Sequence, residues 1–350
     1  MDAMERSLNS KADPGGPPTP TDQSTGVRMF RPTRTIRAQK PCEQSSFITP
    51  DKELFEEHHV GVPLVDQAVW ELVIDGLVEE MIVLSFTDLC TLPQTTVTSF
   101  HECYGSPLRP SLVNGWKVGN VVWTGVRLST ILNLAKPSVS ATYVWSEGLD
   151  YGTFAGKTAE CYQKDLPISK AMSDEVIVAY KINGEFLRAE RGGPVRLVVP
   201  GWFGTNSTKW LCRLSVKSSR APGIFASHFY NRADSTSPTG SSSVWAVEPN
   251  SMIVHPSPGA CLKGPKISIY GWAWAASEIS NVRVSLDNCA SWVLADLDSR
   301  GDTSWQRYAI SVDVSQGKHC VVAQATTVTG EEQSLRSGRN HVHTVQFEVN

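Results

Sequence analysis

The chain has 350 residues, of which 41% are hydrophobic and 19% are charged, and its formal net charge is -3. This composition is typical of a globular protein, and at about 150 residues per domain the length predicts two domains. The small net charge gives no broad electrostatic basis for binding nucleic acid or an anionic membrane. No apolar run approaches the roughly 18 residues that span a bilayer, so neither nucleic acid nor a membrane is an expected partner.

Targeting signals are absent from the sequence. Residues 1–45 are rich in Pro, Gly, Ser and Thr and poor in large apolar residues, which predicts a disordered segment. The first residues contain no apolar signal core and carry acids early, and the last four, FEVN, are not a peroxisomal signal. We therefore expect a cytoplasmic protein.

Residues 46–220 mix short strands and helices. Alternation in WELVIDG and MIVLSF predicts a hairpin, and SFTDLCTL predicts a short helix capped by Ser85 or Thr87. Apolar spacing predicts a helix over 126–135, and VIVAYKING and GPVRLVVPG are predicted strands that end in turns. Because no regular βαβ rhythm is present, we expect an α+β domain.

A change of composition separates this region from the rest of the chain. Ser, Thr, Pro and Gly dominate residues 221–245, which predicts a linker. Residues 246–350 contain the short alternating segments KISIYGWAWA, NVRVSLD, SWVLADL, WQRYAISVDV, KHCVVAQATTV and HTVQFEV. Six or seven such strands in roughly 100 residues, with Trp in an early strand, predict an immunoglobulin-like β-sandwich.

The cysteines are spread along the chain. None of the eight forms a CxxC pair, so a zinc site of clustered thiols is not predicted. Disulfides do not persist in a reducing compartment, and most of these thiols are expected to be small buried hydrophobic residues. Cys103 stands out because it ends the β-favouring run TTVTSFHE and precedes a Tyr-Gly-Ser-Pro turn. This position allows four roles: packing residue, nucleophile, disulfide partner or metal ligand.

Another segment gathers cations around a glycine-rich loop. Arg191, Arg196, Lys209 and Arg213 bracket VVPGWFGTNST. Cationic side chains around exposed backbone amides form a cradle for an anion such as phosphate. The alternative is that these cations are exposed charges at strand ends. On this pattern alone, that alternative is favoured over an anion site. The sequence contains no GxGxxG, P-loop, GxSxG or HExxH motif, so the common nucleotide, hydrolase and zinc-protease templates are absent.

Several segments in a fixed order resemble one known family. The order is HHVGVP, WELVIDG, CYGS, NGWKVGNVVWTGVRLSTIL, YQKDLPISKAM, VIVAYKINGEFL and GGPVRLVVPGWFGTNSTKWL. Together they resemble the molybdenum-cofactor domain of the eukaryotic sulfite oxidases and nitrate reductases. The later segments IVHPSPGACLKGPKISIYGWAWA and NVRVSLDNCASWVLADL resemble the family's immunoglobulin-like dimerisation domain. The resemblance implies molybdenum bound by molybdopterin as the cofactor, and a homodimer formed through the C-terminal domain.

The resemblance also assigns residues. Cys103 matches the family's protein ligand to molybdenum, and a thiolate is a soft donor that suits a redox-active metal. The matched cofactor-binding positions are His59, Asp150, Tyr162, Arg191, Arg196 and Lys209. The matched positions in the substrate pocket, for which the resemblance implies catalytic roles, are Arg109, Trp116, Tyr230 and Arg336.

The substrate pocket departs from the family pattern. The arginine of the family's Arg-Asn-His motif corresponds to Glu57. After Cys103 the family's Ala-Gly-Asn-Arg-Arg becomes Tyr-Gly-Ser-Pro-Leu, and the next basic residue, Arg109, lies one position late. A carboxylate repels a dianion such as sulfite. We therefore hypothesise a neutral, cationic or larger organic substrate.

The implied activity is oxygen-atom transfer at a cysteine-ligated molybdenum centre, with oxidation of sulfite to sulfate as the default reaction. The same chemistry on another small molecule is one alternative, and a cofactor-binding protein without catalysis is another. The sequence shows neither the haem nor the flavin domain of the family. Electrons are therefore expected to pass to oxygen or to a soluble carrier.

Overall fold

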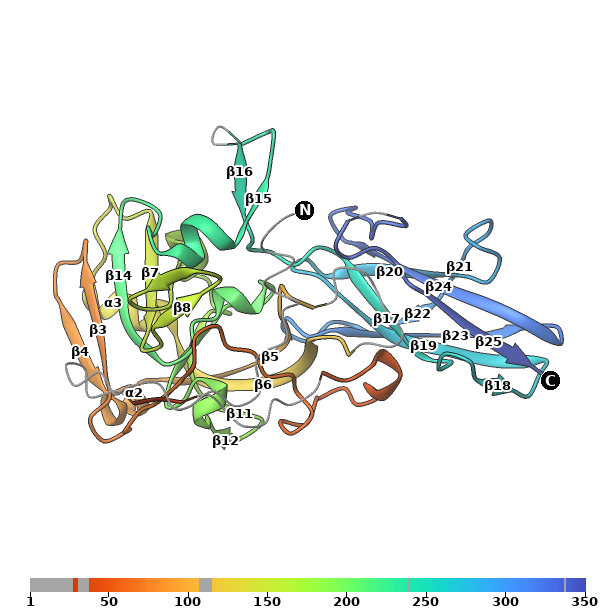
Figure 1. Cartoon of the computed structure of the whole chain (residues 1–350), viewed down its shortest axis with the longest axis horizontal. Helices are drawn as coiled ribbons and strands as arrows, with labels where there is room; N and C mark the ends of the chain where they lie inside the picture. The colour runs from red at the N-terminus through yellow and green to blue at the C-terminus, as the bar shows by residue number, and fades with distance from the viewer. Residues whose placement is uncertain (1–27, 31–37, 107–114, 238–239, 337) are drawn as a thin grey trace.

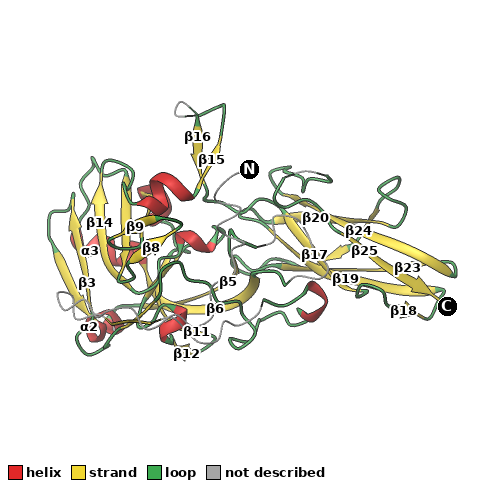
Figure 2. Ribbon diagram, viewed as in Figure 1, coloured by secondary structure: helices red, strands yellow, loops and turns green. Residues whose placement is uncertain are grey.

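The chain folds mainly as β-sheet, with a few short helices between the strands (Figure 2). The computed structural model describes residues 28–30, 38–106, 115–237, 240–336 and 338–350. In Figure 1 the strands β3 to β14 lie at one end of an elongated molecule and the strands β17 to β25 at the other. Helices and strands mix in the first domain, as predicted, but sheet dominates both domains.

The first domain contains a five-stranded sheet in the order β10-β7-β14-β3-β4. Its strands are β3 (Glu71–Gly76), β4 (Ile82–Ser85), β7 (Tyr143–Gly148), β10 (Gln163–Pro167) and β14 (Leu211–Lys217). Strands β3 and β4 form the antiparallel hairpin that the alternation predicts. Helix α2 (Phe86–Thr91) follows at once, and the Ser85 hydroxyl accepts a hydrogen bond of 3.1 Å from the Asp88 amide. Ser85 is therefore the N-cap, one of the two predicted residues.

A second sheet of this domain carries Cys103 just beyond the end of one strand and Arg196 in another. Its order is β12-β11-β6-β5, and β13 pairs with β11. The strands are β5 (Gln94–Glu102), β6 (Val118–Arg127), β11 (Ile177–Ile182), β12 (Glu185–Phe186) and β13 (Arg196–Val198). Strands β5 and β6 are antiparallel, with Glu102 opposite Val118. The Cys103 amide then donates 2.9 Å to the Lys117 carbonyl, so the hairpin sets these two residues side by side.

The two sheets share one hydrophobic core. Helix α3 (Leu128–Ala135), within the predicted range 126–135, buries Leu128, Ile131 and Leu132 on one face. These side chains pack with Leu72 of β3 and Val178 of β11, which belong to different sheets. The core therefore lies between the two sheets.

Short elements surround the site. They are helix α4 (Ile168–Ala171), strands β8 (Gly152–Phe154) and β9 (Lys157–Ala159), and the 3-10 helices η2 (Ala189–Arg191) and η3 (Gly204–Asn206). Gly192, which ends η2, has a φ of 91°, and a Cβ there would lie 2.7 Å from the Cβ of Lys209. This close approach requires glycine and lets the Lys209 segment pass beside η2.

The interval 221–245, predicted as a linker, is folded where the structure describes it. It contains the π-helix η4 (Phe225–Phe229) and the antiparallel strands β15 (Asn231–Ala233) and β16 (Ser241–Ser243). Phe225, Phe229 and Tyr230 are buried in a hydrophobic cluster. The composition missed this because three large aromatic residues within a polar stretch are enough to anchor it in the core.

Part of the stretch predicted as disordered is also folded. Strand β1 (Arg28–Phe30) pairs with β2 (Val62–Leu64), and the 3-10 helix η1 (Pro41–Glu43) buries Pro41. The rest of residues 1–45 lies mostly outside the described part of the chain. Among the described helices, none is long and apolar enough to span a bilayer.

The second domain packs two sheets face to face. One has the order β17-β19-β23-β22 and the other β18-β25-β24-β20-β21. The strands are β17 (Asn250–His255), β18 (Cys261–Leu262), β19 (Lys266–Trp274), β20 (Ile279–Ser285), β21 (Val293–Leu294), β22 (Asp296–Leu297), β23 (Gln306–Asp313), β24 (Gly317–Thr327) and β25 (Thr344–Val349). Ile269 and Tyr308 from the first sheet share a core with Val282, Val321 and Phe347 from the second. Five of the six predicted strand segments coincide with β19, β20, β23, β24 and β25, whereas SWVLADL splits into β21 and β22, which lie in different sheets.

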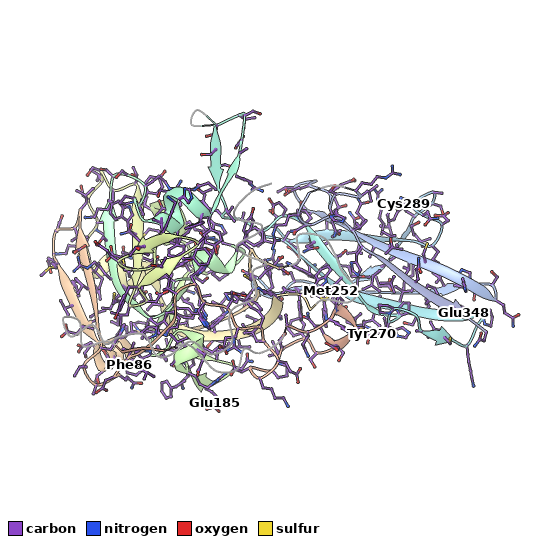
Figure 3. The ribbon with its side chains drawn as sticks, viewed as in Figure 1. Phe86, Glu185, Met252, Tyr270, Cys289 and Glu348 are labelled. Atoms are coloured by element: carbon purple, nitrogen blue, oxygen red, sulfur yellow. The ribbon has the colours of Figure 1, made fainter. Side chains whose placement is uncertain are left out.

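A cluster of aromatic residues joins the domains. Met252, labelled on β17 in Figure 3, belongs to the same buried cluster as Phe100 of β5. Trp272 and Trp305 stack with ring centroids 4.9 Å apart in this cluster. The Trp274 indole donates a hydrogen bond of 2.9 Å to the carboxylate of Glu102. The second domain therefore packs directly behind the strand that carries Cys103.

Candidate functional site

The first domain encloses a cavity with about 680 Å³ of empty space, part of which opens to solvent. Its lining residues are Leu54, Phe55, Glu57, His58, His59, His101, Cys103, Asp150, Tyr162, Arg191, Arg196, Gly204, Thr205, Ser207, Lys209, Trp210 and Tyr230. The structure thus brings together Cys103, Tyr230 and all the predicted cofactor-binding positions.

The other predicted pocket residues lie elsewhere. Trp116 is buried at the junction of the domains, where its ring centroid is 5.1 Å from that of His343, and it does not line the cavity. Arg336 is exposed and does not line the cavity either. Arg109 lies outside the described residues.

Cys103 projects into the cavity from the end of β5. Its sulfur accepts a hydrogen bond of 3.3 Å from the Gly105 amide, and among the described residues no cysteine forms a disulfide. Burial, followed by the charge of the Glu57 carboxylate, raises the pKa of the Cys103 thiol. The thiol is therefore not an activated nucleophile by itself, and a bound metal ion would be needed to remove its proton.

Arg339 of the second domain braces the Cys103 loop. Its guanidinium donates 2.8 Å to the Cys103 carbonyl and 3.0 Å to the Tyr104 carbonyl, and it forms a 2.9 Å ion pair with Glu102. It also lies 4.4 Å from the centroid of the Phe203 ring. The sequence analysis passed over this residue in favour of Arg336, three positions earlier in the same loop.

His59 and Tyr230 meet on one wall of the cavity. The His59 Nε2 atom and the Tyr230 hydroxyl are hydrogen-bonded, and the His59 ring is 4.8 Å from Phe225 and 5.2 Å from Tyr162 between ring centroids. Burial, reinforced by the charge of Lys209, lowers the pKa of His59 to about 3. His59 is therefore neutral at pH 7, so one ring nitrogen donates a hydrogen bond and the other accepts one.

Arg196 is buried and Lys209 is half-buried in the cavity wall. Arg196 donates to the carbonyls of Arg191 at 3.1 Å and Ser207 at 3.0 Å, and Lys209 donates to those of Glu57 at 2.9 Å and Glu190 at 2.8 Å. No salt bridge joins either cation to a carboxylate in the described part of the chain. Burial and neighbouring cations lower the pKa of Arg196 to about 9 and that of Lys209 to about 7. Both side chains would gain from a bound anion.

Arg191 has a different environment, although it lines the same cavity. Its guanidinium pairs with the Asp51 carboxylate at 2.6 Å and donates to the carbonyls of Leu54 at 2.9 Å and Phe55 at 2.7 Å. Its charge is therefore compensated, and it fixes the segment that leads to His58 and His59.

Asp150 and Tyr162 complete another wall. Burial raises the pKa of Asp150 to about 7, and its Oδ1 atom is buried without a hydrogen-bond partner in the structure. The Tyr162 hydroxyl donates a hydrogen bond of 2.7 Å to the Thr205 carbonyl. An unpartnered buried oxygen at a cavity wall calls for a donor on a ligand.

Glu57 forms an ion pair with Lys117 near Cys103. Glu57 is one of the residues that line the cavity, and the side chains are 40% exposed for Glu57 and 28% for Lys117. The sequence analysis did not select Lys117, although the register of strands β5 and β6 places it opposite Cys103.

Comparison with known proteins identifies the class. Residues 59–225 match the family model of the oxidoreductase molybdopterin binding domain, and residues 241–340 match that of the Mo-co oxidoreductase dimerisation domain. The chain therefore joins a molybdopterin-binding domain to a dimerisation domain. It belongs to the sulfite oxidase-like family of molybdopterin oxidoreductases, as the resemblance in its sequence predicts.

Relatives of the chain include enzymes with several named activities. It is 29% identical over 317 residues to mitochondrial sulfite oxidase of Homo sapiens, covering 81% of this chain and 57% of that protein. It is 32% identical over 319 residues to the NADPH nitrate reductase of Aspergillus niger, covering 79% and 35% respectively. The solved structure of the sulfane dehydrogenase SoxCD from Paracoccus pantotrophus superposes with a TM-score of 0.76 at 27% identity, covering 93% of this chain and 85% of that one. The chain thus spans little more than half of the human sulfite oxidase and about a third of the fungal nitrate reductase.

The residues present fit a molybdopterin cofactor. Arg196 and Lys209, whose charges lack a carboxylate partner among the described residues, suit its phosphate. Asp150 offers an unpartnered acceptor to a pterin N–H group, and Cys103 offers a thiolate to the metal. Within the described residues no group of three or more His, Cys, Asp and Glu side chains is arranged to hold a metal ion.

Proposed function

We propose that this protein is a molybdenum-cofactor oxidoreductase that transfers an oxygen atom to a small sulfur compound, with oxidation of sulfite to sulfate as the first reaction to test. The observation that carries the proposal is one cavity with a thiol at one wall and two cations, Arg196 and Lys209, that form no salt bridge with any described carboxylate. When bound, the cofactor supplies a molybdenum centre that exchanges an oxygen atom and two electrons with the substrate.

Different residues of the chain would bind the metal, the cofactor phosphate and the substrate. Cys103 would be the protein ligand to the metal, and Arg196 and Lys209 would hold the phosphate of the cofactor. Tyr230, whose hydroxyl is hydrogen-bonded to neutral His59, would orient the substrate. The low pKa of His59 keeps a further positive charge out of this wall at physiological pH.

The proposal extends to the second domain and to the electron acceptor. Its sheet orders, A-B-E-D for β17-β19-β23-β22 and G-F-C for β25-β24-β20, support an immunoglobulin-like sandwich. We infer that this domain forms a homodimer, which the match to the dimerisation family supports. Oxygen or a soluble carrier would accept the electrons, and the location would be cytoplasmic.

The test compares the wild type with Cys103→Ser, and with Cys90→Ser as a control at an exposed cysteine. Sulfite-dependent reduction of ferricyanide or cytochrome c is measured on protein matured with the cofactor. The wild type and Cys90→Ser should reduce the acceptor, whereas Cys103→Ser should lose at least 99% of the rate. Equal rates in all three proteins would contradict the role of Cys103.

A second candidate is the same chemistry on a different sulfur compound. The superposition with a protein described as a sulfane dehydrogenase supports it, because that match covers almost the whole chain. A non-catalytic cofactor-binding protein is the remaining alternative. Bound molybdenum without turnover of a broad substrate panel would favour that alternative.

A further inference from the structure

We infer that Glu57 and Lys117 form a charge filter beside Cys103, which makes the substrate end of the cavity favour uncharged or zwitterionic sulfur compounds over dianionic oxyanions. This inference rests on the proposed function and deepens it by naming the substrate class.

The position of Glu57 is the first step. Glu57 lines the cavity with Cys103 and Tyr230, and its carboxylate pairs with Lys117, whose carbonyl accepts a hydrogen bond of 2.9 Å from the Cys103 amide. The charge of Glu57 contributes to the raised pKa of the Cys103 thiol, second only to burial. It also adds to the rise in the pKa of the Tyr230 hydroxyl, which burial dominates. The negative charge of Glu57 is therefore felt at both groups that a substrate would meet.

The state of the nearby cations is the second step. Lys117 and Arg339 are the cations whose charges act most on Cys103. Lys117 is paired with Glu57, and Arg339 is paired with buried Glu102 while it also holds the Cys103 carbonyl. Each of these positive charges therefore has a carboxylate partner. These two pairs bring no net positive charge beside Cys103, whereas on the Tyr230 side the Lys164 ammonium lies 5.3 Å from the centroid of the Tyr230 ring.

The consequence concerns the substrate. A dianion that approaches Cys103 loses part of its hydration shell. The Glu57 carboxylate would repel it, and Lys117, which is already paired with Glu57, would compensate little of that cost. A thioether carries no charge, and a zwitterion can set its ammonium group against Glu57. In the reaction, the sulfur gains an oxygen atom derived from water, two protons are released, and two electrons pass to two equivalents of a one-electron acceptor.

The filter is tested with two neutralising variants of opposite sign, Glu57→Gln and Lys117→Gln, in cofactor-loaded protein. Glu80→Gln is the matched control, because Glu80 forms an exposed pair with Lys136 at 2.5 Å. Sulfate serves as the dianionic probe in calorimetric titrations. Glu57→Gln should tighten sulfate binding roughly tenfold, and Lys117→Gln should weaken it by a similar factor. Glu80→Gln should leave it unchanged.

Any pattern other than opposite shifts in the two variants would overturn the inference, because general damage to the site would weaken binding in both. A kinetic measurement adds a second criterion. Glu57→Gln should lower the KM for sulfite roughly tenfold and change the KM for dimethyl sulfide less than about threefold. Failure of the proposed function would appear differently, as wild-type protein without molybdenum or without turnover of any sulfur compound.

Discussion

At the scale of single residues, the cavity is defined by charges that the fold leaves without carboxylate partners among the described residues. Lys209 is half-buried among carbonyl oxygens and near other cations, and desolvation together with the charges of Arg196 and Arg191 lowers its pKa to about 7. Such a residue weakens the folded protein when the cavity lacks an anion and strengthens it when an anion binds.

Replacing Lys209 should therefore separate cofactor binding from stability. Lys209→Met should lower the pterin content of purified protein roughly tenfold or more, because a charge-assisted contact to the phosphate is lost. The free energy of unfolding of the cofactor-free protein should stay the same or rise. Pterin fluorescence after oxidative release and chemical denaturation measure the two quantities. Lys157→Met, at an exposed position, is the control, and equal pterin content in both variants would refute the role of Lys209.

His343 gives the second domain a pH-sensitive residue away from the cavity. Burial, with a smaller effect of His341, lowers the pKa of His343 from 6.5 to about 4. Between these values the unfolded chain binds more protons than the folded one, so the stability contributed by neutral His343 is present above pH 6.5 and is lost toward pH 4. His343→Gln should remove up to roughly 3 kcal/mol of this loss. Urea denaturation at pH 7 and pH 4.5 measures the free energy of unfolding of both proteins. If the loss of stability between these pH values is the same in His343→Gln as in the wild type, the role of His343 is contradicted.

At the scale of elements, one loop of the second domain supports one loop of the first. Arg339 lies between β24 and β25, and it holds two carbonyls of the Cys103 loop as well as the Glu102 carboxylate. Glu102 is only 1% exposed, so the loss of its partner would leave a buried charge uncompensated.

We expect Arg339→Ala to destabilise the protein by about 3 kcal/mol and to lower its molybdenum content. Arg339→Lys should restore part of the stability, since it returns the charge without the forked geometry. Thermal unfolding and elemental analysis measure the two effects. Arg336→Ala, at an exposed position in the same loop, should behave as the wild type. A wild-type melting temperature for Arg339→Ala would rule out the brace.

Local elements could be predicted from the sequence because their causes are local. The β3–β4 hairpin and the Ser85 cap depend on residues a few positions apart. The folded state of the interval 221–245 depends instead on contacts such as that between His59 and Tyr230, which are 171 residues apart. Composition does not record such contacts, and for the same reason the choice between Arg336 and Arg339 could not be made from the sequence.

At the scale of the whole molecule, the two domains form one structure around the Cys103 strand. The ordered set of motifs gave the domain pair because it extends over both domains, and the family models match both. The charge balance at the substrate end could not be predicted in the same way. It depends on Lys117 and Arg339, which come from separate parts of the chain and meet only in the fold.

The oligomeric state is a prediction at this scale. The chain has a mass of 38.3 kDa, and sedimentation equilibrium should give twice this value if the second domain forms the proposed homodimer. The mass should be independent of protein concentration in the micromolar range, because dimerisation domains bury large interfaces. A single species of one chain mass would contradict the dimer.

The most direct test of the account is the molybdenum and pterin content of the folded, fully matured protein. Elemental analysis and pterin fluorescence should each give close to one equivalent per chain. A matured, folded protein that contains neither molybdenum nor pterin would contradict the central claim.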